Sequence, residues 1–185
     1  MPKINSSKKG SKNERELAHA FEEWTGYKFA RVPRSGGLRW QRTLDTTGDL
    51  IVADTEHIHE FPFSVETKFH SEVNFWKILR GQKSDLLEFW RQAVEDGERG
   101  KKVPIVFFRF NGLPKQYWFC IISYKLYRAI KDKLFFEYGF VNYENTIVIF
   151  EALYLFESNY KTLLPIVKKH QKALHNEPVR NNPDK

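Results

Sequence analysis

Apolar residues recur at the spacing of an α-helix in several stretches of the chain. In the first stretch Leu17, Phe21 and Trp24 fall on one face, and Gly26 follows where the pattern stops. Charged and polar residues occupy the opposite face, as is typical of a helix that packs one side against a core. The pattern predicts helices over 11–26, 83–97 and 123–135, and a last helix after 157 that passes into a polar tail.

Runs rich in Val, Ile, Phe and Tyr lie between these helices and are typical of β-strands. Two of the runs flank Asn111-Gly112, a turn sequence that predicts a β-hairpin. Strands and helices mixed in this order predict a mixed sheet with helices packed on it, an α/β or α+β fold. The expected extended segments are 27–33, 50–54, 61–69, 103–110, 116–122 and 146–150.

Composition supports a single domain with a substantial core, because 41% of the 185 residues are apolar and 16 are Phe. Cys120 is the sole cysteine, so we expect a buried structural thiol and no internal disulfide. The chain has no 18-residue apolar run and no signal-peptide pattern. We therefore expect a cytoplasmic protein without a membrane partner, in the host cytoplasm if the source is a phage.

Positive charge is concentrated at the N-terminal end. The net charge is +7, and residues 1–42 carry ten Lys or Arg against four Glu. A basic segment attracts polyanions through release of their counterions, which favours a nucleic-acid partner. An ordinary solvated basic surface is the alternative.

The stretch FSVETKFH, 63–70, carries charge within a strand pattern. Alternate residues of a strand share a face, so Phe63, Val65 and Thr67 point to one side, and Glu66 and Lys68 point to the other. The first side packs. The charged side faces either solvent, with a weak ion pair, or a functional site.

A second carboxylate favours the functional site. Asp49 directly precedes a strand, and we expect it one hairpin away from Glu66. Two neighbouring carboxylates repel one another unless a cation lies between them, and their hard oxygen atoms suit Mg²⁺ or Mn²⁺. Such an ion can polarise a phosphodiester and activate water. Lys68 could orient that water or neutralise the charge that develops on the phosphorane.

These residues match a known pattern. Gly48-Asp49, sixteen residues and then Glu66-Thr67-Lys68 resemble the PD-(D/E)xK nuclease superfamily, with Gly48 in place of the usual Pro. The stretch KGSKNERELAHAFEEWTGYKFARVPRSGG, 9–37, resembles the start of archaeal-type Holliday junction resolvases. The resemblance extends over about 8–122.

The resemblance implies a restriction-endonuclease-like mixed central β-sheet flanked by helices, with a C-terminal helical extension. It assigns a metal role to Asp49 and Glu66 and a catalytic role to Lys68. It also brings in Glu14 for the metal site and Ser35 for catalysis. Two further expectations are a Thr67 carbonyl ligand and a Gln82 side chain that points at the active site.

Helix geometry separates Glu14 from its neighbour Glu16. At about 100° per residue, Glu14 falls with the packing stripe and Glu16 falls on the opposite, solvent-facing side. The alternative for Glu14 is a capping box with Ser11, in which the carboxylate would bond to the backbone at the start of the helix.

A basic loop follows the first helix and contains Gly36-Gly37. Arginine suits phosphates because its planar fork bonds them bidentately. A surface loop without a ligand is the alternative. The expected DNA-binding residues are Lys8, Lys9, Lys12, Arg31, Arg34, Arg39 and Arg42.

The resulting hypothesis is a Mg²⁺-dependent, structure-selective endonuclease that resolves four-way DNA junctions as a homodimer, without a nucleotide cofactor. Mn²⁺ is expected to substitute. The alternatives are another nuclease of the superfamily (repair, exonuclease or restriction-like) and a non-catalytic DNA-binding module with the same fold. We expect a flexible basic N-terminus over 1–10, a nuclease domain over 11–155, and a C-terminal helix and polar tail over 156–185.

Overall fold

The computed structural model describes residues 6–32, 47–54, 56–80, 82–135, 139–142 and 146–176, without the side chains of 6–9 and 79. The helices are α1 (Ser6–Thr25), α3 (Phe75–Leu79), α4 (Asp85–Gly100), α5 (Tyr124–Ile130), η1 (Lys131–Lys133), α6 (Leu153–Phe156) and α7 (Tyr160–Asn176). The strands are β1 (Phe29–Arg31), β2 (Leu50–Val52), β3 (Phe63–His70), β4 (Val103–Phe110), β5 (Phe119–Ser123), β6 (Gly139–Asn142) and β7 (Ile147–Glu151).

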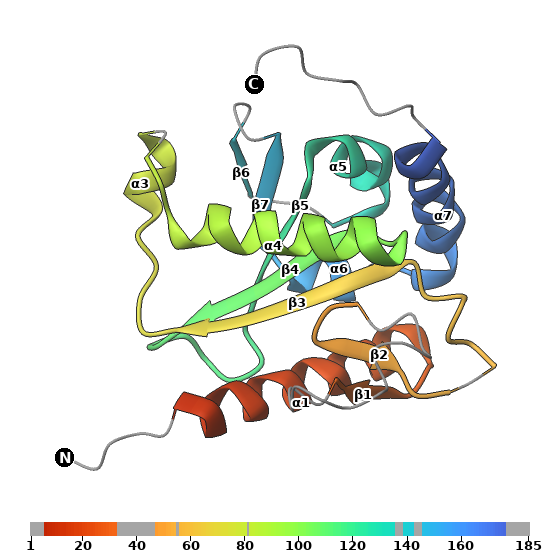
Figure 1. The fold of residues 1–185 in the computed structure, drawn as a ribbon, viewed down its shortest axis with the longest axis horizontal. Helices are drawn as coiled ribbons and strands as arrows, with labels where there is room; N and C mark the ends of the chain where they lie inside the picture. The colour runs from red at the N-terminus through yellow and green to blue at the C-terminus, as the bar shows by residue number, and fades with distance from the viewer. Residues whose placement is uncertain are drawn as a thin grey trace.

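Five strands form the central sheet in the order β3-β4-β5-β7-β6 (Figure 1). β3 and β4 run parallel, and Glu66 lies beside Val106 in their register. The other neighbours are antiparallel, and β4 and β5 form the expected hairpin. The mixed sheet predicted from the sequence is therefore confirmed, with β3 at one edge.

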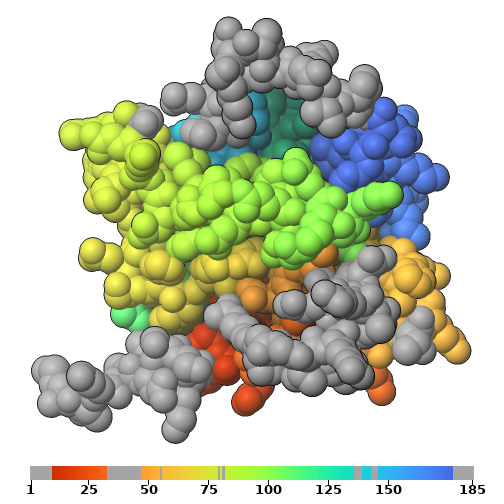
Figure 2. All heavy atoms as spheres, viewed as in Figure 1, coloured from red at the N-terminus to blue at the C-terminus, as the bar shows by residue number. Residues whose placement is uncertain are grey.

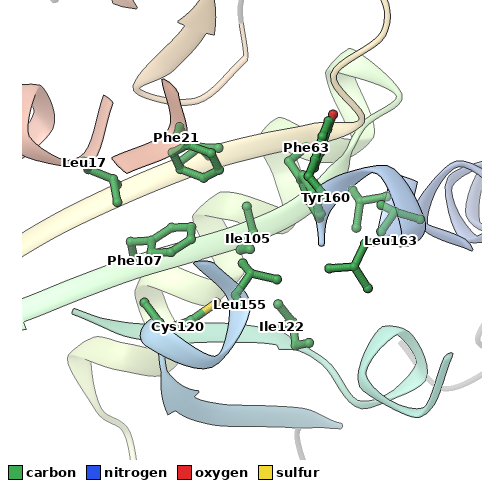
Figure 3. Close-up of a cluster of buried hydrophobic side chains, with 14 of the residues drawn as sticks. Leu17, Phe21, Phe63, Ile105, Phe107, Cys120, Ile122, Leu155, Tyr160 and Leu163 are labelled. Atoms are coloured by element: carbon green, nitrogen blue, oxygen red, sulfur yellow. The ribbon is translucent and has the colours of Figure 1, made fainter. Parts of the chain in front are cut away.

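The sheet is covered on both faces. On one face, residues of α1, α5, α6 and α7 pack against inward-facing side chains of the strands, and Figure 3 shows part of this cluster around Phe21, Phe107 and Leu155. Cys120 is fully buried in it, and burial raises the pKa of its thiol well above the ordinary value. On the other face, α3 and α4 cover Val106, Phe108 and residues of β5 and β7. β3 therefore lies between α1 and α4.

Most predicted elements are present, with some differences at their ends. α1 begins at Ser6, five residues before the predicted start, because the lysine-containing segment 6–10 is compatible with a helix. α4 begins where Ser84 caps it, with the Ser84 hydroxyl accepting from the Leu87 N–H at 3.4 Å. The short α3, α6 and β6 were not predicted. In the described part of the chain, no helix is both long and apolar enough to cross a membrane.

One expected relationship is wrong. β2 pairs with β1 in a separate two-stranded sheet, and it does not form a hairpin with β3. The segment before β2 instead meets β3 through one parallel bridge between Gly48 and Val65. Gly48 permits this approach because a side chain there would overlap the backbone of Val65. The contact between Gly48 and Val65 thus places Asp49 next to the part of β3 that contains Glu66.

Candidate active site

Asp49 is fixed against the outer edge of β3 by two hydrogen bonds to the main chain of that strand. Its N–H donates to the Val65 carbonyl at 2.7 Å, and its carboxylate Oδ2 accepts from the Thr67 N–H at 2.9 Å. The preceding Gly48 has φ +81°, a conformation that proline cannot adopt. Glycine in place of the superfamily's usual proline is therefore what this backbone requires.

The Thr67 backbone faces this carboxylate, whereas its side chain does not. In a β-strand the N–H and C=O of one residue point to the same side, so the Thr67 carbonyl also points away from β4 towards the edge occupied by Asp49. The Thr67 hydroxyl faces α1, where it accepts from the Asn13 amide at 2.7 Å. A main-chain oxygen is thus available beside Asp49.

Glu66 and Lys68 lie on the opposite face of β3, under α4. Lys68 Nζ is 2.5 Å from Glu66 Oε1 and 5.4 Å from the centre of the Phe89 ring. Glu66 is 8% exposed and the Lys68 side chain is 20% exposed, so α4 covers most of this charged face but leaves part of it accessible. Figure 2 shows α4 in green across this side of the molecule, with the yellow residues of β3 beneath it.

The electrostatics at Glu66 favour a cation. Burial raises the pKa of the Glu66 carboxyl above its ordinary value, repulsion from Asp49 raises it further, and the Lys68 ammonium opposes both effects. Asp96 of α4, which pairs with Arg99 at 2.7 Å, adds a smaller repulsion. The charged form of Glu66 is therefore disfavoured in the folded protein despite Lys68, mainly because the carboxyl group is buried.

Glu14 lies on α1, which packs against the other face of β3. It is 3% exposed, as helix geometry predicted, and its carboxylate accepts a charge-assisted hydrogen bond from Arg31 of β1. Arg31 also donates to the Ser11 hydroxyl at 3.0 Å. Because α1 begins at Ser6, Ser11 lies inside the helix, and the alternative of a capping box is wrong.

The helix-wheel prediction that Glu16 points to solvent is wrong. Its side chain is only 20% exposed and its Oε2 accepts from Arg109 Nη1 at 2.9 Å. The wheel placed it on the solvent side because it assumed that only the Leu17 and Phe21 stripe packs. α1 instead contacts the sheet over a wider arc, and Arg109 of β4 supplies a buried partner.

Asn13 was missed as a positioning residue. It is buried, donates to the Thr67 hydroxyl, and accepts from the Trp118 indole N–H at 2.8 Å. It thereby joins α1, β3 and the residue before β5. Its place beside Glu14 in the KGSKNER stretch was a usable signal, and so was the lone Arg109 in the apolar run VPIVFFRF.

Of the other predicted residues, the structure describes the side chains of Gln82 and Lys12, and neither has a hydrogen bond or ion pair to Asp49, Glu66 or Lys68 within the described residues. Gln82 is exposed in the α3–α4 connection, where its N–H donates to the Lys77 carbonyl at 2.8 Å. Lys12 is exposed on α1, and its Nζ lies 3.8 Å from Glu16 Oε1. The residues outside the described side chains are Lys8, Lys9, Arg34, Ser35, Arg39 and Arg42.

The donor set fits a hard divalent cation that keeps part of its water shell. Asp49 and Glu66 supply carboxylate oxygens, and Thr67 supplies a carbonyl. Among the described residues, no three His, Cys, Asp or Glu side chains converge into a complete metal cage. Mg²⁺ commonly binds through one or two carboxylates and completes its shell with water and phosphate oxygens. Such an ion would stabilise the charged form of Glu66, which burial and Asp49 disfavour.

The mixed sheet and the placement of Asp49, Glu66 and Lys68 on it are similar to those of the PD-(D/E)xK superfamily. The chain matches over residues 5–166 the model of a family described as "Phage putative PDDEXK endonuclease", and it belongs to that family. Protein D14 of Escherichia phage T5 is 27% identical over 108 residues, which are 57% of this chain and 65% of the relative. The chain thus spans less than two thirds of that relative's length. No solved structure matches it.

Proposed function

We propose that the protein is a divalent-metal-dependent endodeoxyribonuclease that hydrolyses DNA at four-way junctions. The observation that carries the proposal is the Asp49 carboxylate, held by the Thr67 N–H beside the Glu66–Lys68 pair. This arrangement is what the superfamily motif requires, although β2 lies outside the main sheet. The family's description as endonucleases supports cutting within a strand.

The proposal gives the residues of the site separate roles. Asp49, Glu66 and the Thr67 carbonyl would hold Mg²⁺, for which Mn²⁺ would substitute. The ion supplies Lewis-acid polarisation of the phosphodiester and a lower pKa for the attacking water. Lys68 Nζ donates a hydrogen bond to that water or to a non-bridging phosphate oxygen, where negative charge develops.

Glu14 belongs to the α1 side of the same edge. Because Arg31 holds its carboxylate, we assign it first to positioning α1 against β1, and to a metal only if substrate displaces Arg31. Ser35 and Gln82 support the phosphate or its water shell in this proposal. The basic residues predicted in the N-terminal segment bind the DNA backbone without reading bases.

Junction selectivity rests on the resemblance of 8–122 to archaeal-type resolvases. A four-way junction is cut on two strands, so a homodimer with two-fold related sites suits it. A second candidate is another endonuclease specificity, on duplex or flap DNA. The family match favours this candidate as much as the first, because its description names no substrate structure.

The test is cleavage of labelled four-way junction, flap, duplex and single-stranded DNA, each with Mg²⁺ and with EDTA. Wild type is compared with Glu66→Gln, Lys68→Ala and the exposed α1 control Glu23→Gln. We expect paired symmetric nicks on the junction, lost with EDTA, and rates at least about 10²-fold lower in the two site variants. Binding in EDTA and the control's cleavage should be retained.

Each other outcome has a distinct meaning. Metal-dependent cutting of flap or duplex DNA in preference to the junction would overturn the resolvase specificity and retain the nuclease. Salt-sensitive binding without cleavage in any metal would support the non-catalytic alternative. Full activity of Glu66→Gln would contradict the proposed site.

A further inference from the structure

A small pocket lies beyond the candidate active site, at the C-terminal ends of β3 and β4. Its volume is about 210 Å³. The connection between β4 and β5 runs beside the N-terminal half of α1 here (Figure 1), and a Trp118–Asn13 hydrogen bond joins the two. The pocket is lined by Lys12, Asn13, Glu16, Phe69, Arg109 and Lys115.

Arg109 forms the base of the pocket. Its side chain is 9% exposed and is held by Glu16 and by the Pro114 carbonyl, both at 2.9 Å. The guanidinium carbon lies 5.4 Å from the Phe69 ring centre and 5.8 Å from that of Trp118. Within the described residues its Nε is buried without a hydrogen-bond acceptor. The base is therefore rigid and retains an unused donor.

The charge of the lining is positive. Glu16 is the only acidic residue among the six, against Lys12, Arg109 and Lys115. Glu16 is already engaged by Arg109, and Lys12 Nζ is more distant from it, at 3.8 Å. Lys115 is exposed at the rim. Two exposed lysines thus flank a buried, hydrogen-bonded guanidinium around a space large enough for a phosphate group.

We propose that this pocket is a phosphate-binding subsite for the backbone of the nucleic acid on which the active site acts, with Lys12 and Lys115 as its direct contacts. The inference rests on the proposed function, because it places the subsite on the same DNA strand path. Asn13 lines the pocket and also bonds to Thr67 of the active site. Asn13 and the Thr67 side chain thus connect the pocket to the strand that carries the candidate active site, and in this proposal the DNA backbone runs from one to the other.

Contacts to phosphate leave a measurable salt signature. Each phosphate neutralised by a lysine releases condensed counterions, and the slope of log K against log [salt] changes by about 0.9 per contact on duplex DNA. A contact of this kind carries no sequence information. Loss of Lys12 or Lys115 should therefore weaken all DNA sequences equally.

The experiment measures binding of labelled duplex and four-way junction DNA by fluorescence anisotropy in EDTA, over a salt series. The variants are Lys12→Gln and Lys115→Gln, with Lys161→Gln on the distant α7 as the matched control. We expect several-fold weaker binding and a slope reduced by about one for each pocket variant, and no change for the control. Lys115→Arg should keep the wild-type affinity and the wild-type salt slope, because it keeps the charge.

Binding by the pocket variants that equals the control, in both affinity and slope, would overturn the subsite. A weaker affinity with an unchanged slope, not restored by Lys115→Arg, would also overturn it, because it would indicate a structural effect. These measurements need no cleavage. Failure of wild type to cut any DNA with Mg²⁺ or Mn²⁺ would instead overturn the proposed function and leave the subsite supported by binding.

Discussion

The Thr67 N–H donates to the Asp49 carboxylate at 2.9 Å, and this bond helps to connect β3 with the segment that leads into β2 of the other sheet. Asp49 adjoins β2, whereas Thr67 lies in β3 between Glu66 and Lys68. The motif residues are therefore assembled at a sheet edge through main-chain contacts. Any change that moves the backbone at Gly48 should separate them.

Replacement of Gly48 tests this dependence. In Gly48→Ala the added carbon would lie 2.3 Å from the Val65 carbonyl oxygen, and alanine would also be strained at φ +81°. The control is Gly112→Ala, where φ is +90° but no atom lies within 4 Å, so only strain applies. We expect Gly48→Ala to lose about 1–3 kcal/mol more unfolding free energy than Gly112→Ala, measured by urea denaturation. Equal losses would contradict the role of the close approach.

Much of the fold could be predicted from the sequence because its elements have strong periodic patterns. β4 covers 103–110 as predicted, and α4 differs by a few residues at its ends. The short elements α3, α6 and β6 span too few residues for a period to be visible. Their formation depends on tertiary contacts such as the burial of Ile78 and Leu155.

Part of the site could be predicted for the same reason. Strand alternation placed Glu66 and Lys68 together, and helix periodicity buried Glu14. The partners of Glu14 and Glu16 could not be predicted, because Arg31 and Arg109 lie on other elements, 17 and 93 residues along the chain from them. A helix wheel treats one helix alone and contains no information about a buried arginine on β4.

Asn13 should contribute to stability through both the nitrogen and the oxygen of its side-chain amide. Asn13→Ala removes the partner of the Trp118 indole N–H and that of the Thr67 hydroxyl, at distances of 2.8 and 2.7 Å. Because these groups are buried, we expect a loss of about 1–3 kcal/mol in unfolding free energy by urea denaturation. Asn176→Ala, at the exposed end of α7, is the control and should change little. A neutral Asn13→Ala would mean that water replaces both bonds.

The pair of Arg31 and Glu14 predicts a strong coupling. Arg31→Ala removes the charged partner of a carboxylate that is 3% exposed, so we expect a loss of about 1–3 kcal/mol in unfolding free energy. Arg31→Ala combined with Glu14→Gln should lose less than the sum of the single variants. Arg91→Ala, whose partners Glu88 and Glu95 lie on the surface of α4, should cost much less stability than Arg31→Ala.

DNA binding by Arg31→Ala separates the two roles of this residue. If Arg31 only holds Glu14, the variant keeps the wild-type salt slope for duplex binding in EDTA at a temperature where it is folded. A slope reduced by about one would assign Arg31 to a phosphate as well. Additive stability losses in the double variant would contradict the coupling itself.

The raised pKa of Glu66 predicts how metal-free stability depends on pH. Its folded pKa lies above the ordinary value of 4.5, because burial and Asp49 outweigh Lys68. The folded state therefore binds a proton at Glu66 more tightly than the unfolded state does. The stability that this proton gives to the folded state is fully present below pH 4.5 and is lost as the pH rises through the folded pKa. Glu66→Gln removes the ionisation, so in EDTA at pH 7 it should unfold at a higher temperature than wild type.

The difference should shrink as the pH falls and vanish below the ordinary pKa, where wild-type Glu66 is protonated in both states. Glu88→Gln is the opposite control, because Arg91 lowers the pKa of Glu88 and its neutralisation offers no such gain. Addition of Mg²⁺ should raise the melting temperature of wild type and leave that of Glu66→Gln nearly unchanged, because the variant lacks a ligand. A Glu66→Gln variant that is less stable than wild type at pH 7 in EDTA would show that Lys68 already compensates the buried charge. The electrostatic argument for a cation at this edge of β3 would then be wrong.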